Sequence, residues 1–478
     1  MANGLNKLDR RLQRRSRRRR RHAPALVALG RAADNAKIWL FLSAVLAVAD
    51  GRFGRRAGLR GLLSIGLASA VANGPVKHLV RRRRPPESNV GRFLAGRPAP
   101  STTSFPSGHS ASAFAFATGA ATELPVLAAP LAGLAGLVSY SRLHSGAHYP
   151  LDVVVGAAVG VAAALGTRRF WPAAPHDGAK VRTVFAPAST ARSPDGGGVV
   201  VVVNQAAGQG NGTADQLRAE LPAAEVVEVE DGNDIGDALE DAAGRAQVLG
   251  VAGGDGSINT AAGVAAEAGK PLLVVPGGTL NHFAAALGID SVGEAAAAVR
   301  GGRAVTVDRG LIAGHTFVNT ASIGSYCDLV DAREKLEGRI GKWPAVAIAL
   351  WRVLRHSQPV EMEIDGRRRC VWMIFIGNCR YHPAGFTPSW RERLDDGTLD
   401  VRIVDGERPW TRAHLLFSVL TGRLARCRSY EQRFVKELSV RSLEGPLRLA
   451  RDGETFDGPE SFTIAKAETP LIVYAPPA

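Results

Sequence analysis

The chain has 478 residues, 46% of them hydrophobic, and a formal net charge of +15 at pH 7. This length exceeds one ordinary domain, so two or three domains are expected. The four cysteines all lie in the last third without a C-x-x-C pair, which argues against a disulfide framework or a cysteine zinc site and is typical of a reducing compartment.

Residues 1–22 form a strongly basic tail. Ten Lys or Arg side chains against Asp9 alone contribute +9 of the net charge of +15. Such a run repels itself, which predicts a disordered segment with a polyanionic partner. No aromatic residue of the tail could stack on bases, so an anionic membrane surface is favoured over nucleic acid. A merely solvated tail is the remaining alternative.

Residues 23–170 are rich in small and aliphatic residues and contain five apolar stretches. Most are shorter than the roughly 20 residues that span a bilayer, and each alone could be a buried helix of a soluble bundle. Five together, with small residues that permit close helix packing, favour an all-α membrane helical bundle. A signal peptide ending at Ala49 is a weaker alternative, because the leader before it is too long. The five stretches lie near 37–49, 59–76, 110–122, 125–140 and 151–166.

The composition changes after this region. Residues 171–197 contain four prolines and end in glycines, which predicts a linker. In residues 198–305, apolar runs alternate with Gly-rich turns and Ala-rich helical stretches, which predicts a doubly wound α/β nucleotide lobe. Short strands dominate residues 306–478, so a second lobe, a β-sandwich, is expected. Examples of these strands are 371–376, 399–404 and 471–474.

Three short motifs in the first half place cations near helix ends. Lys77 and Arg84 follow one apolar stretch, and Arg142 ends another. Arginine's planar fork fits two phosphate oxygens at once, and lysine adds a point charge. Ser107 and Gly108 open the third apolar stretch, where free backbone N–H groups can hold an anion. These residues are therefore candidate phosphate ligands.

Two histidines complete the motifs. His148 precedes a proline-initiated helix, with Asp152 one turn further on and placed to fix the tautomer of the imidazole. The expected chemistry is attack of His148 on phosphorus, stabilisation by the cations and helix starts, and protonation of the leaving oxygen by His109. Water then hydrolyses the phosphohistidine, and no metal is needed. Either histidine alone would more often be structural.

Together these motifs resemble the type 2 phosphatidic acid phosphatase family, whose pattern K-x6-RP…PSGH…SR-x5-H-x3-D is matched without departure over about residues 59–166. The resemblance implies a membrane bundle that acts on lipid phosphates or diphosphates. It makes His148 the nucleophile, His109 the acid and Asp152 the residue that orients His148. The phosphate-binding residues that it implies are Lys77, Arg84, Ser107, Gly108 and Arg142.

Gly-rich turns after two predicted strands mark a second candidate site. In the turn 253–257, glycines let the backbone wrap an ATP phosphate, and Asp255 can act through Mg²⁺. The turn 276–281 follows the next strand, at the same carboxyl edge where α/β sheets bind ligands. In the β-rich lobe, the carboxylates of Asp452 and Glu454 could accept the proton of a substrate hydroxyl. Each segment alone could be only a turn.

This set resembles the diacylglycerol kinase catalytic domain, related to sphingosine kinases and NAD kinases, over about residues 197–476. The resemblance implies ATP–Mg²⁺ as donor and a lipid hydroxyl as acceptor. Gln205 and His282 depart from the family patterns N-P-x-S-G and G-T-x-N-D, so a weakened or altered kinase stays open. The nucleotide-binding residues that it implies are Asn204, Gly253, Gly254, Asp255, Gly256, Ser257, Gly277, Gly278, Thr279 and Asn281.

The two halves together predict a bifunctional lipid-phosphate enzyme of the cell membrane. ATP places the kinase half in the cytoplasm, and five crossings would then place the phosphatase motifs on the opposite face. The seven Lys or Arg between residues 77 and 107 argue against that face, because basic loops prefer the cytoplasm. An even number of crossings therefore stays open. The alternatives are that only one half is catalytic and the other a binding module, or that the second half resembles an NAD kinase in activity.

Overall fold

The protein is described by a computed structural model that forms two compact units, Met1–Ala174 and Pro175–Ala478. The expected basic tail, apart from Asp9, and the expected nucleotide ligand Thr279 lie outside the described residues. The residues that the structure describes are 9, 24–49, 51–80, 82, 84, 103–173, 175, 178–184, 194–206, 212–230, 234–278, 281–340, 342–384, 389–407, 411–420 and 424–476.

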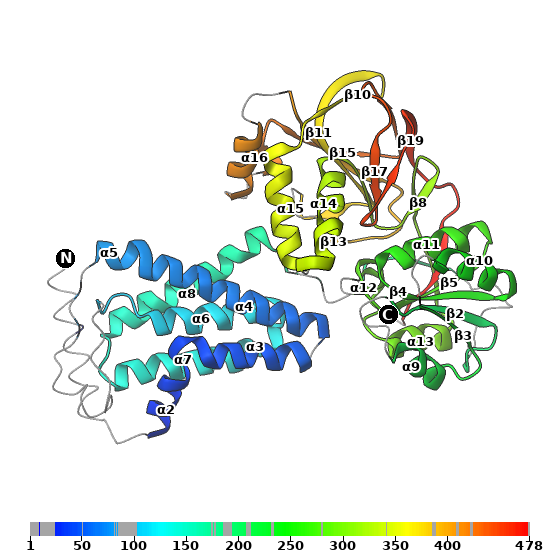
Figure 1. Cartoon of the computed structure of the whole chain (residues 1–478). Coiled ribbons are helices and arrows are strands. Elements are labelled where there is room, and N and C mark those ends of the chain that lie inside the picture. Colours follow the sequence, from blue (N-terminus) through cyan, green and yellow to red (C-terminus); the bar gives the residue numbers. More distant parts are fainter. Residues whose placement is uncertain are drawn as a thin grey trace. The chain divides into compact units, whose positions relative to one another are not determined.

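The described part of the first unit is helical (Figure 1). Its five longer helices run alternately in opposite directions, because short turns reverse the chain after α3, α6 and α7. The ends of α4 and α7 therefore lie with the starts of α3, α6 and α8 at one end of the bundle. The helices are α2 (Pro24–Ala32), α3 (Lys37–Ala49), α4 (Gly51–Val71), α5 (Lys77–Leu79), α6 (Gly108–Glu123), α7 (Ala128–His144) and α8 (Pro150–Phe170).

Small residues let these helices approach closely. A Cβ atom added to Gly160 of α8 would lie 2.8 Å from the backbone nitrogen of Ala115 in α6. A Cβ atom on Gly61 of α4 would lie 2.6 Å from the ring of Phe116, which in turn packs 5.1 Å from the ring of Trp39 in α3. Glycine removes the steric barrier at each contact, so the sequence positions of glycine determine which helices can pack.

The bundle buries polar groups and exposes large apolar ones. Arg60 of α4 and Glu123 of α6 are fully buried and form an ion pair of 2.5 Å at the end of the bundle where α8 finishes. Among the described residues, two helical segments, Pro125–His144 and Pro150–Phe170, are long and apolar enough to cross a membrane. The exposed apolar side chains of α3, α4, α7 and α8 include Leu40, Phe41, Val48, Leu59, Leu63, Leu137, Val154 and Leu165.

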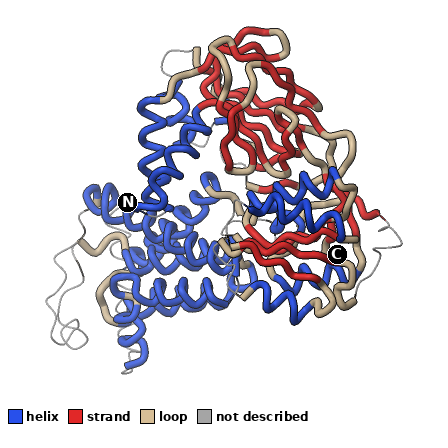
Figure 2. Tube along the Cα trace, turned by 45° about the vertical axis from the view of Figure 1, so that its right-hand side comes forward, coloured by secondary structure: helices blue, strands red, loops and turns tan. Residues whose placement is uncertain are grey.

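The second unit begins with an α/β lobe. Its described strands form a seven-stranded sheet in the order β1-β6-β20-β5-β4-β2-β3, in which β2 to β5 are parallel. Helices α10 (Ile235–Arg245) and α11 (Asp255–Glu267) cover one face, and α9 (Thr213–Glu220) and α13 (Val292–Gly301) cover the other (Figures 1 and 2). The strands are β1 (Arg182–Val184), β2 (Val199–Asn204), β3 (Glu225–Val229), β4 (Val248–Gly253), β5 (Leu272–Pro276), β6 (Ala304–Val307) and β20 (Leu471–Tyr474).

Two segments lie in this sheet although the sequence analysis placed them elsewhere. Residues Arg182–Val184, expected in the linker, form β1 and pair with β6 at the edge of the sheet. Residues Leu471–Tyr474, expected in the β-rich lobe, form β20 between β5 and β6. Leu471, Val473 and Tyr474 are buried there, because a strand covered by helices on both faces is apolar along its length.

The described part of the β-rich lobe contains an 11-stranded branched sheet (among the red strands of Figure 2) and a separate two-stranded sheet of β12 (Tyr381–His382) and β13 (Trp390–Arg391). The described strands of the larger sheet follow the order β18-β17-β9-β11-β10-β16-β19-β7-β8, and β14 and β15 branch from β11. One apolar core fills the space between them. The strands are β7 (Gly310–Ile312), β8 (His315–Phe317), β9 (Thr320–Gly324), β10 (Val360–Ile364), β11 (Arg367–Asn378), β14 (Leu399–Asp405), β15 (Tyr430–Val435), β16 (Glu437–Ser442), β17 (Arg448–Arg451), β18 (Glu454–Asp457) and β19 (Ser461–Lys466).

Three helices also belong to this lobe, which the sequence analysis expected to consist of short strands. They follow β9 and β14 and lie beside the sheet (Figure 1). The expectation was incomplete because two of them carry long apolar runs that also fit buried strands. The helices are α14 (Ser325–Ile340), α15 (Lys342–His356) and α16 (Thr411–Leu420).

Candidate functional sites

His148 lies in the turn between α7 and α8, buried at the bundle end where the motifs meet. Its Nδ1 is 2.7 Å from the carbonyl oxygen of Ser104, and the carboxylate of Asp152 is 3.8 Å away. A carbonyl only accepts, so Nδ1 carries the proton and Nε2 keeps its lone pair. Burial lowers the pKa of His148, against the effect of Asp152, and the nearby Arg84 and Arg142 lower it further. The ring is therefore neutral at pH 7.

Asp152 is held by two other groups rather than bonded directly to the imidazole. Its Oδ2 accepts the backbone N–H of Tyr149 at 3.0 Å, and its Oδ1 lies 2.8 Å from Nη1 of Arg82. The Arg82 guanidinium also stacks 4.1 Å from the Tyr149 ring. The backbone carbonyl of Arg82 accepts the N–H of Ser104. The Ser104 carbonyl thus takes the tautomer-fixing contact that the sequence analysis gave to Asp152. Arg82 supports both groups behind His148.

Sequence reasoning missed Arg82 and Ser104. Arg82 is one of four consecutive arginines, and only folding shows which of them reaches the Asp152 carboxylate. It also forms an ion pair of 2.6 Å with Asp9, whose Oδ1 accepts the backbone N–H of Leu151 in the first turn of α8. Ser104 acts through its main chain, which no side-chain pattern reveals.

Two guanidinium groups lie near both histidines. Arg84 and Arg142 each interact electrostatically with His109 and with His148, so both cations lie within electrostatic range of both rings. Nε of Arg142 is buried and has no hydrogen-bond partner among the described residues. Lys77 is close enough to Arg84 for the two like charges to repel. Clustered cations with an unused donor are the arrangement that an anionic ligand stabilises.

The start of α6 completes this site. Ser107 is its N-cap: the Ser107 Oγ accepts the hydroxyl of Ser110 at 3.1 Å and lies 3.5 Å from the Ser110 nitrogen. The Ser107 hydroxyl hydrogen remains a possible donor, because these contacts use only its acceptor capacity. A Cβ atom added to Gly108 would meet nothing within 4 Å, so the backbone is open there. The structure therefore brings all the predicted phosphatase residues to one end of the bundle.

His109 has a carboxylate partner that the sequence analysis did not identify. Its Nε2 lies 2.8 Å from Oδ1 of Asp34, in the short turn Asp34–Ala36 between α2 and α3. Asp34 belongs to no motif, so no sequence pattern connects it with a histidine 75 positions further on.

In the α/β lobe, the two Gly-rich turns pack backbone against backbone. The N–H of Gly277 donates to the carbonyl of Gly253 at 2.9 Å, and a Cβ atom on Gly278 would lie 2.6 Å from Cα of Gly254. Asn281, with a left-handed φ of 49°, accepts the N–H of Gly278 and donates to its carbonyl, both at 2.8 Å. These contacts require glycine and hold both turns at the carboxyl edge of the sheet.

Three further predicted residues lie at the same edge. Asp255 starts α11, and its Oδ1 accepts the N–H of Phe283 in the first turn of α12 (His282–Leu287) at 3.3 Å. Its Oδ2 accepts no hydrogen bond within the described part of the chain. Asn204, at the end of β2, donates to the Ser257 hydroxyl at 2.9 Å. His282, where the family pattern has a carboxylate, is exposed.

The two predicted carboxylates of the β-rich lobe have different surroundings. Asp452 accepts three backbone N–H groups at 2.7 to 2.9 Å, those of Val318, Asn319 and Thr320. Burial raises the pKa of Asp452 to about 6, against the effect of these hydrogen bonds. Glu454 is exposed and lies against Gly256, where an added Cβ atom would be 3.1 Å from the Glu454 carboxylate carbon. Glu454 is thus at the start of α11, beside the Gly-rich turns.

A buried arginine also binds the loop between β8 and β9, whose N–H groups donate to Asp452. Arg391 donates to the carbonyl of Val318 at 2.7 Å and to the side-chain oxygen of Asn319 at 2.8 Å. The Tyr381 hydroxyl donates to the carbonyl of Asn319 at 3.3 Å. Sequence reasoning missed both, because neither belongs to a pattern. Asp452 and Arg391 together fix the loop between β8 and β9.

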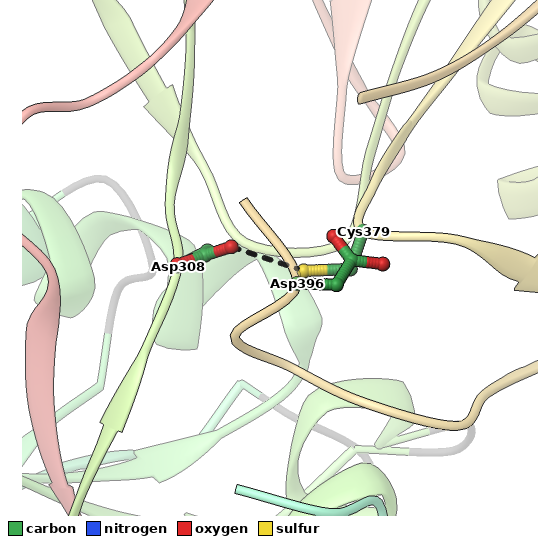
Figure 3. A group of neighbouring side chains, drawn as sticks. All are labelled: Asp308, Cys379 and Asp396. Atoms are coloured by element: carbon green, nitrogen blue, oxygen red, sulfur yellow. Dashed lines mark hydrogen bonds between the residues drawn. The ribbon is translucent and has the colours of Figure 1, made fainter. Parts of the chain in front are cut away.

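Asp308, Cys379 and Asp396 form a cluster of metal-ligand type in the β-rich lobe (Figure 3). The Lys466 ammonium already lies within it, 3.0 Å from Oδ2 of Asp308 and 3.3 Å from Sγ of Cys379. Burial raises the pKa of the Cys379 thiol to about 12, so it is a poor metal ligand at pH 7. The cluster therefore fits a structural ion pair better than a metal ion.

Two family models match the chain. The PAP2 superfamily matches residues 57–175, and the diacylglycerol kinase catalytic domain matches residues 198–312. The first match contains the three phosphatase motifs, and the second contains the two Gly-rich turns but not Asp452 and Glu454.

Curated relatives divide in the same way. Diacylglycerol kinase of Bacillus subtilis is 35% identical over 32% of this chain and 53% of its own length. Decaprenylphosphoryl-5-phosphoribose phosphatase of Mycobacterium tuberculosis is 39% identical over 26% of this chain and 65% of its own, and that of Mycolicibacterium smegmatis is 34% identical over 27% and 68%. The probable lipid kinase YegS-like of Pseudomonas aeruginosa is 30% identical over 45% and 72%. The chain thus spans about half to two thirds of the first of these relatives.

Proposed function

Because this chain belongs to the PAP2 superfamily through residues 57–175 and to the diacylglycerol kinase catalytic family through residues 198–312, we propose that it is a bifunctional lipid-phosphate enzyme. The first unit removes a phosphate from a lipid phosphate or diphosphate. The second transfers the terminal phosphate of ATP to a lipid hydroxyl. The phosphatases and lipid kinases among the relatives support both activities.

The phosphatase proposal is carried by the two cations that lie near both histidines. Nε2 of His148 attacks phosphorus and forms a P–N bond, while the P–O bond to the lipid breaks and its oxygen takes a proton from His109. Arg84, Arg142 and Lys77 bind the phosphoryl oxygens throughout. Water, deprotonated by His109, then attacks phosphorus, the P–N bond breaks, and phosphate leaves. The unused Arg142 Nε is the donor that the phosphoryl group satisfies.

The kinase proposal rests on Glu454 beside the Gly-rich turns. The backbone of these turns binds the ATP phosphates at the start of α11. Oδ2 of Asp255, an oxygen ligand of the kind that Mg²⁺ prefers, would hold the ion, which supplies charge neutralisation when bound. The Glu454 carboxylate accepts the proton of the lipid hydroxyl, and Asp452 positions the loop that faces it.

The surface of the helical bundle supports a multi-pass membrane location. Large apolar side chains point outward on several helices, while Arg60, Glu123 and Asp152 are buried inside, the pattern expected in lipid. The five long helices alternate in direction, so the phosphatase site and the start of the linker lie at opposite ends of the bundle. With the kinase in the cytoplasm, the phosphatase acts on the other face, which prevents a futile cycle. We expect the basic tail, residues 1–22, to bind anionic lipid.

A lipid-resolved assay of the full chain with and without ATP tests the assignment. His148→Ala is expected to abolish phosphate release and to leave ATP-dependent phosphorylation intact, and Asp255→Ala to do the reverse. The exposed residues His356 and Asp215 provide matched controls as His356→Ala and Asp215→Ala. If Asp255→Ala leaves every activity intact, the second unit is a binding module. Phosphorylation of NAD instead of lipid would assign it to a soluble substrate.

A further inference from the structure

A carboxylate from outside the matched family region reaches the acid side of the phosphatase site. Asp34 precedes the PAP2 match, which begins at residue 57. Its Oδ1 lies 2.8 Å from Nε2 of His109, and the two side chains are 27% and 25% exposed. The pair is therefore shielded from bulk water on most sides, where a charged hydrogen bond is stronger than at an open surface.

The turn that carries Asp34 is held in a specific conformation. Asn35 and Ala36 have φ values of 53° and 60°, in the left-handed region that alanine rarely adopts. The preceding helix α2 packs on the end of α7, where a Cβ atom on Gly30 would lie 3.1 Å from the Ser141 hydroxyl. The turn is thus fixed against α7, the helix that supplies Arg142. This packing directs Asp34 at the site.

The charges around His109 show what the carboxylate does. Burial lowers the pKa of His109, the hydrogen bond to Asp34 raises it, and the nearby Arg142 and Arg84 lower it further. A general acid must hold a proton before the leaving oxygen departs. Burial and the cations that bind phosphate therefore work against the acid, and Asp34 is the negative charge that acts in the opposite direction.

The hydrogen bond also selects the nitrogen that can transfer the proton. Nε2 is engaged by Asp34, and no other hydrogen bond to the His109 ring occurs within the described ranges. Of the two ring nitrogens, Nδ1 is therefore the one available to the leaving oxygen.

We propose that Asp34 is a positioning residue of the phosphatase reaction, which holds the His109 imidazolium through Nε2–H so that Nδ1–H protonates the leaving oxygen. This inference rests on the phosphatase function proposed above. As the P–O bond breaks, its electron pair moves to the lipid oxygen, which takes the Nδ1 proton. His109 is left neutral, with Nε2–H still bonded to Asp34.

Dependence on the leaving group tests the proposal. Wild type, Asp34→Asn, Asp34→Glu and Lys37→Gln are compared as full chains on dioleoyl phosphatidic acid and on p-nitrophenyl phosphate. The alkoxide of the lipid needs a proton to leave, whereas p-nitrophenolate does not. Asp34→Asn should lower kcat/KM for the lipid by about 100-fold and should leave kcat/KM for the aryl ester within about 3-fold of wild type. Asp34→Glu should recover part of the loss.

The remaining readouts separate a positioning role from a structural one. Lys37, exposed three residues further along, is the charge control, and Lys37→Gln should match wild type on both substrates. In Asp34→Asn the alkaline limb of the lipid pH profile should move to lower pH, because Arg84 and Arg142 then act on His109 unopposed. Equal loss on both substrates, no loss, or a gain of activity would overturn the proposal. Inactivity of wild type on both substrates would instead refute the phosphatase function itself.

Discussion

At the scale of single residues, the groups that we propose to react are held in place by groups with no proposed reactive role. His148 is oriented by a main-chain carbonyl, that of Ser104, and Asp152 stands behind it in contact with Arg82. In the second unit, Asp452 is bound by three N–H groups, whereas Glu454 remains exposed. We therefore assign a positioning role to Asp152 in the first unit and to Asp452 in the second.

The pKa of Asp452 predicts how the kinase responds to acid. Its folded value of about 6 lies above the ordinary 3.8, so the carboxylate is charged above pH 6 and protonated below it. Protonation adds a donor that opposes the three N–H groups of the loop, so kcat/KM for phosphorylation should fall below pH 6, by about tenfold per pH unit. A profile from pH 5 to 8 measures this. An acid limb centred near pH 4 would contradict it.

The raised pKa of Asp452 changes the free energy of unfolding with pH in the direction opposite to its effect on activity. Because the folded pKa is raised, the folded state binds more protons than the unfolded chain between about pH 4 and pH 6. The contribution of Asp452 to the free energy of unfolding is thus lost as pH rises through 6. Activity and stability are expected to change in opposite directions across this window.

At the scale of elements, glycines decide where chemistry can occur along a helix. In α11, Gly256 lies against the Glu454 carboxylate, whereas a Cβ atom on Gly263 would meet only Thr316, at 3.9 Å. The missing side chain at Gly256 therefore leaves room for Glu454 of the β-rich lobe. A side chain at Gly263 would displace nothing.

Gly256→Ala is expected to disable the kinase without unfolding it. The added methyl group must displace the Glu454 carboxylate, a flexible group, so the backbone can stay in place. A displacement of about 1 Å lowers kcat/KM by roughly 100-fold. Gly263→Ala, in the same helix, should keep full activity and gain up to about 1 kcal/mol of stability. Equal activities of the two variants, measured as ATP-dependent lipid phosphorylation, would refute the role of Glu454.

At the scale of the whole molecule, the directions of five helices determine at which end of the bundle the chain continues into the second unit. The phosphatase residues lie where α6 and α8 begin, and Trp171 lies where α8 ends, stacked under Arg56 and Arg60. The chain therefore leaves the bundle at the end opposite the phosphatase site. Under the proposed function, we therefore expect the phosphatase site and the start of the linker to face opposite sides of the membrane.

Sealed vesicles of known orientation can measure this separation. In everted membrane vesicles, ATP-dependent phosphorylation should be measurable at once, and hydrolysis of the impermeant p-nitrophenyl phosphate should appear only after permeabilisation. Right-side-out vesicles should show the reverse. Access to both sites from one face would indicate an even number of crossings.

The sequence by itself determined both families, and it predicted most of the residues that the structure brings together at the two candidate sites. Their motifs are contiguous segments, such as 106–109 and 253–257, in which spacing alone predicts a helix start and an anion site. The five apolar stretches likewise predicted helices, because hydrophobicity is a local property of the chain.

Only the tertiary structure decided which distant groups complete these motifs. Asp34 reaches His109, Arg82 reaches Asp152, and residues Leu471–Tyr474 return to the first sheet. Each contact joins segments tens to hundreds of positions apart, and its partners have no spacing that a local pattern could reveal. Long-range packing chooses one partner among many chemically equal ones, such as one arginine of four.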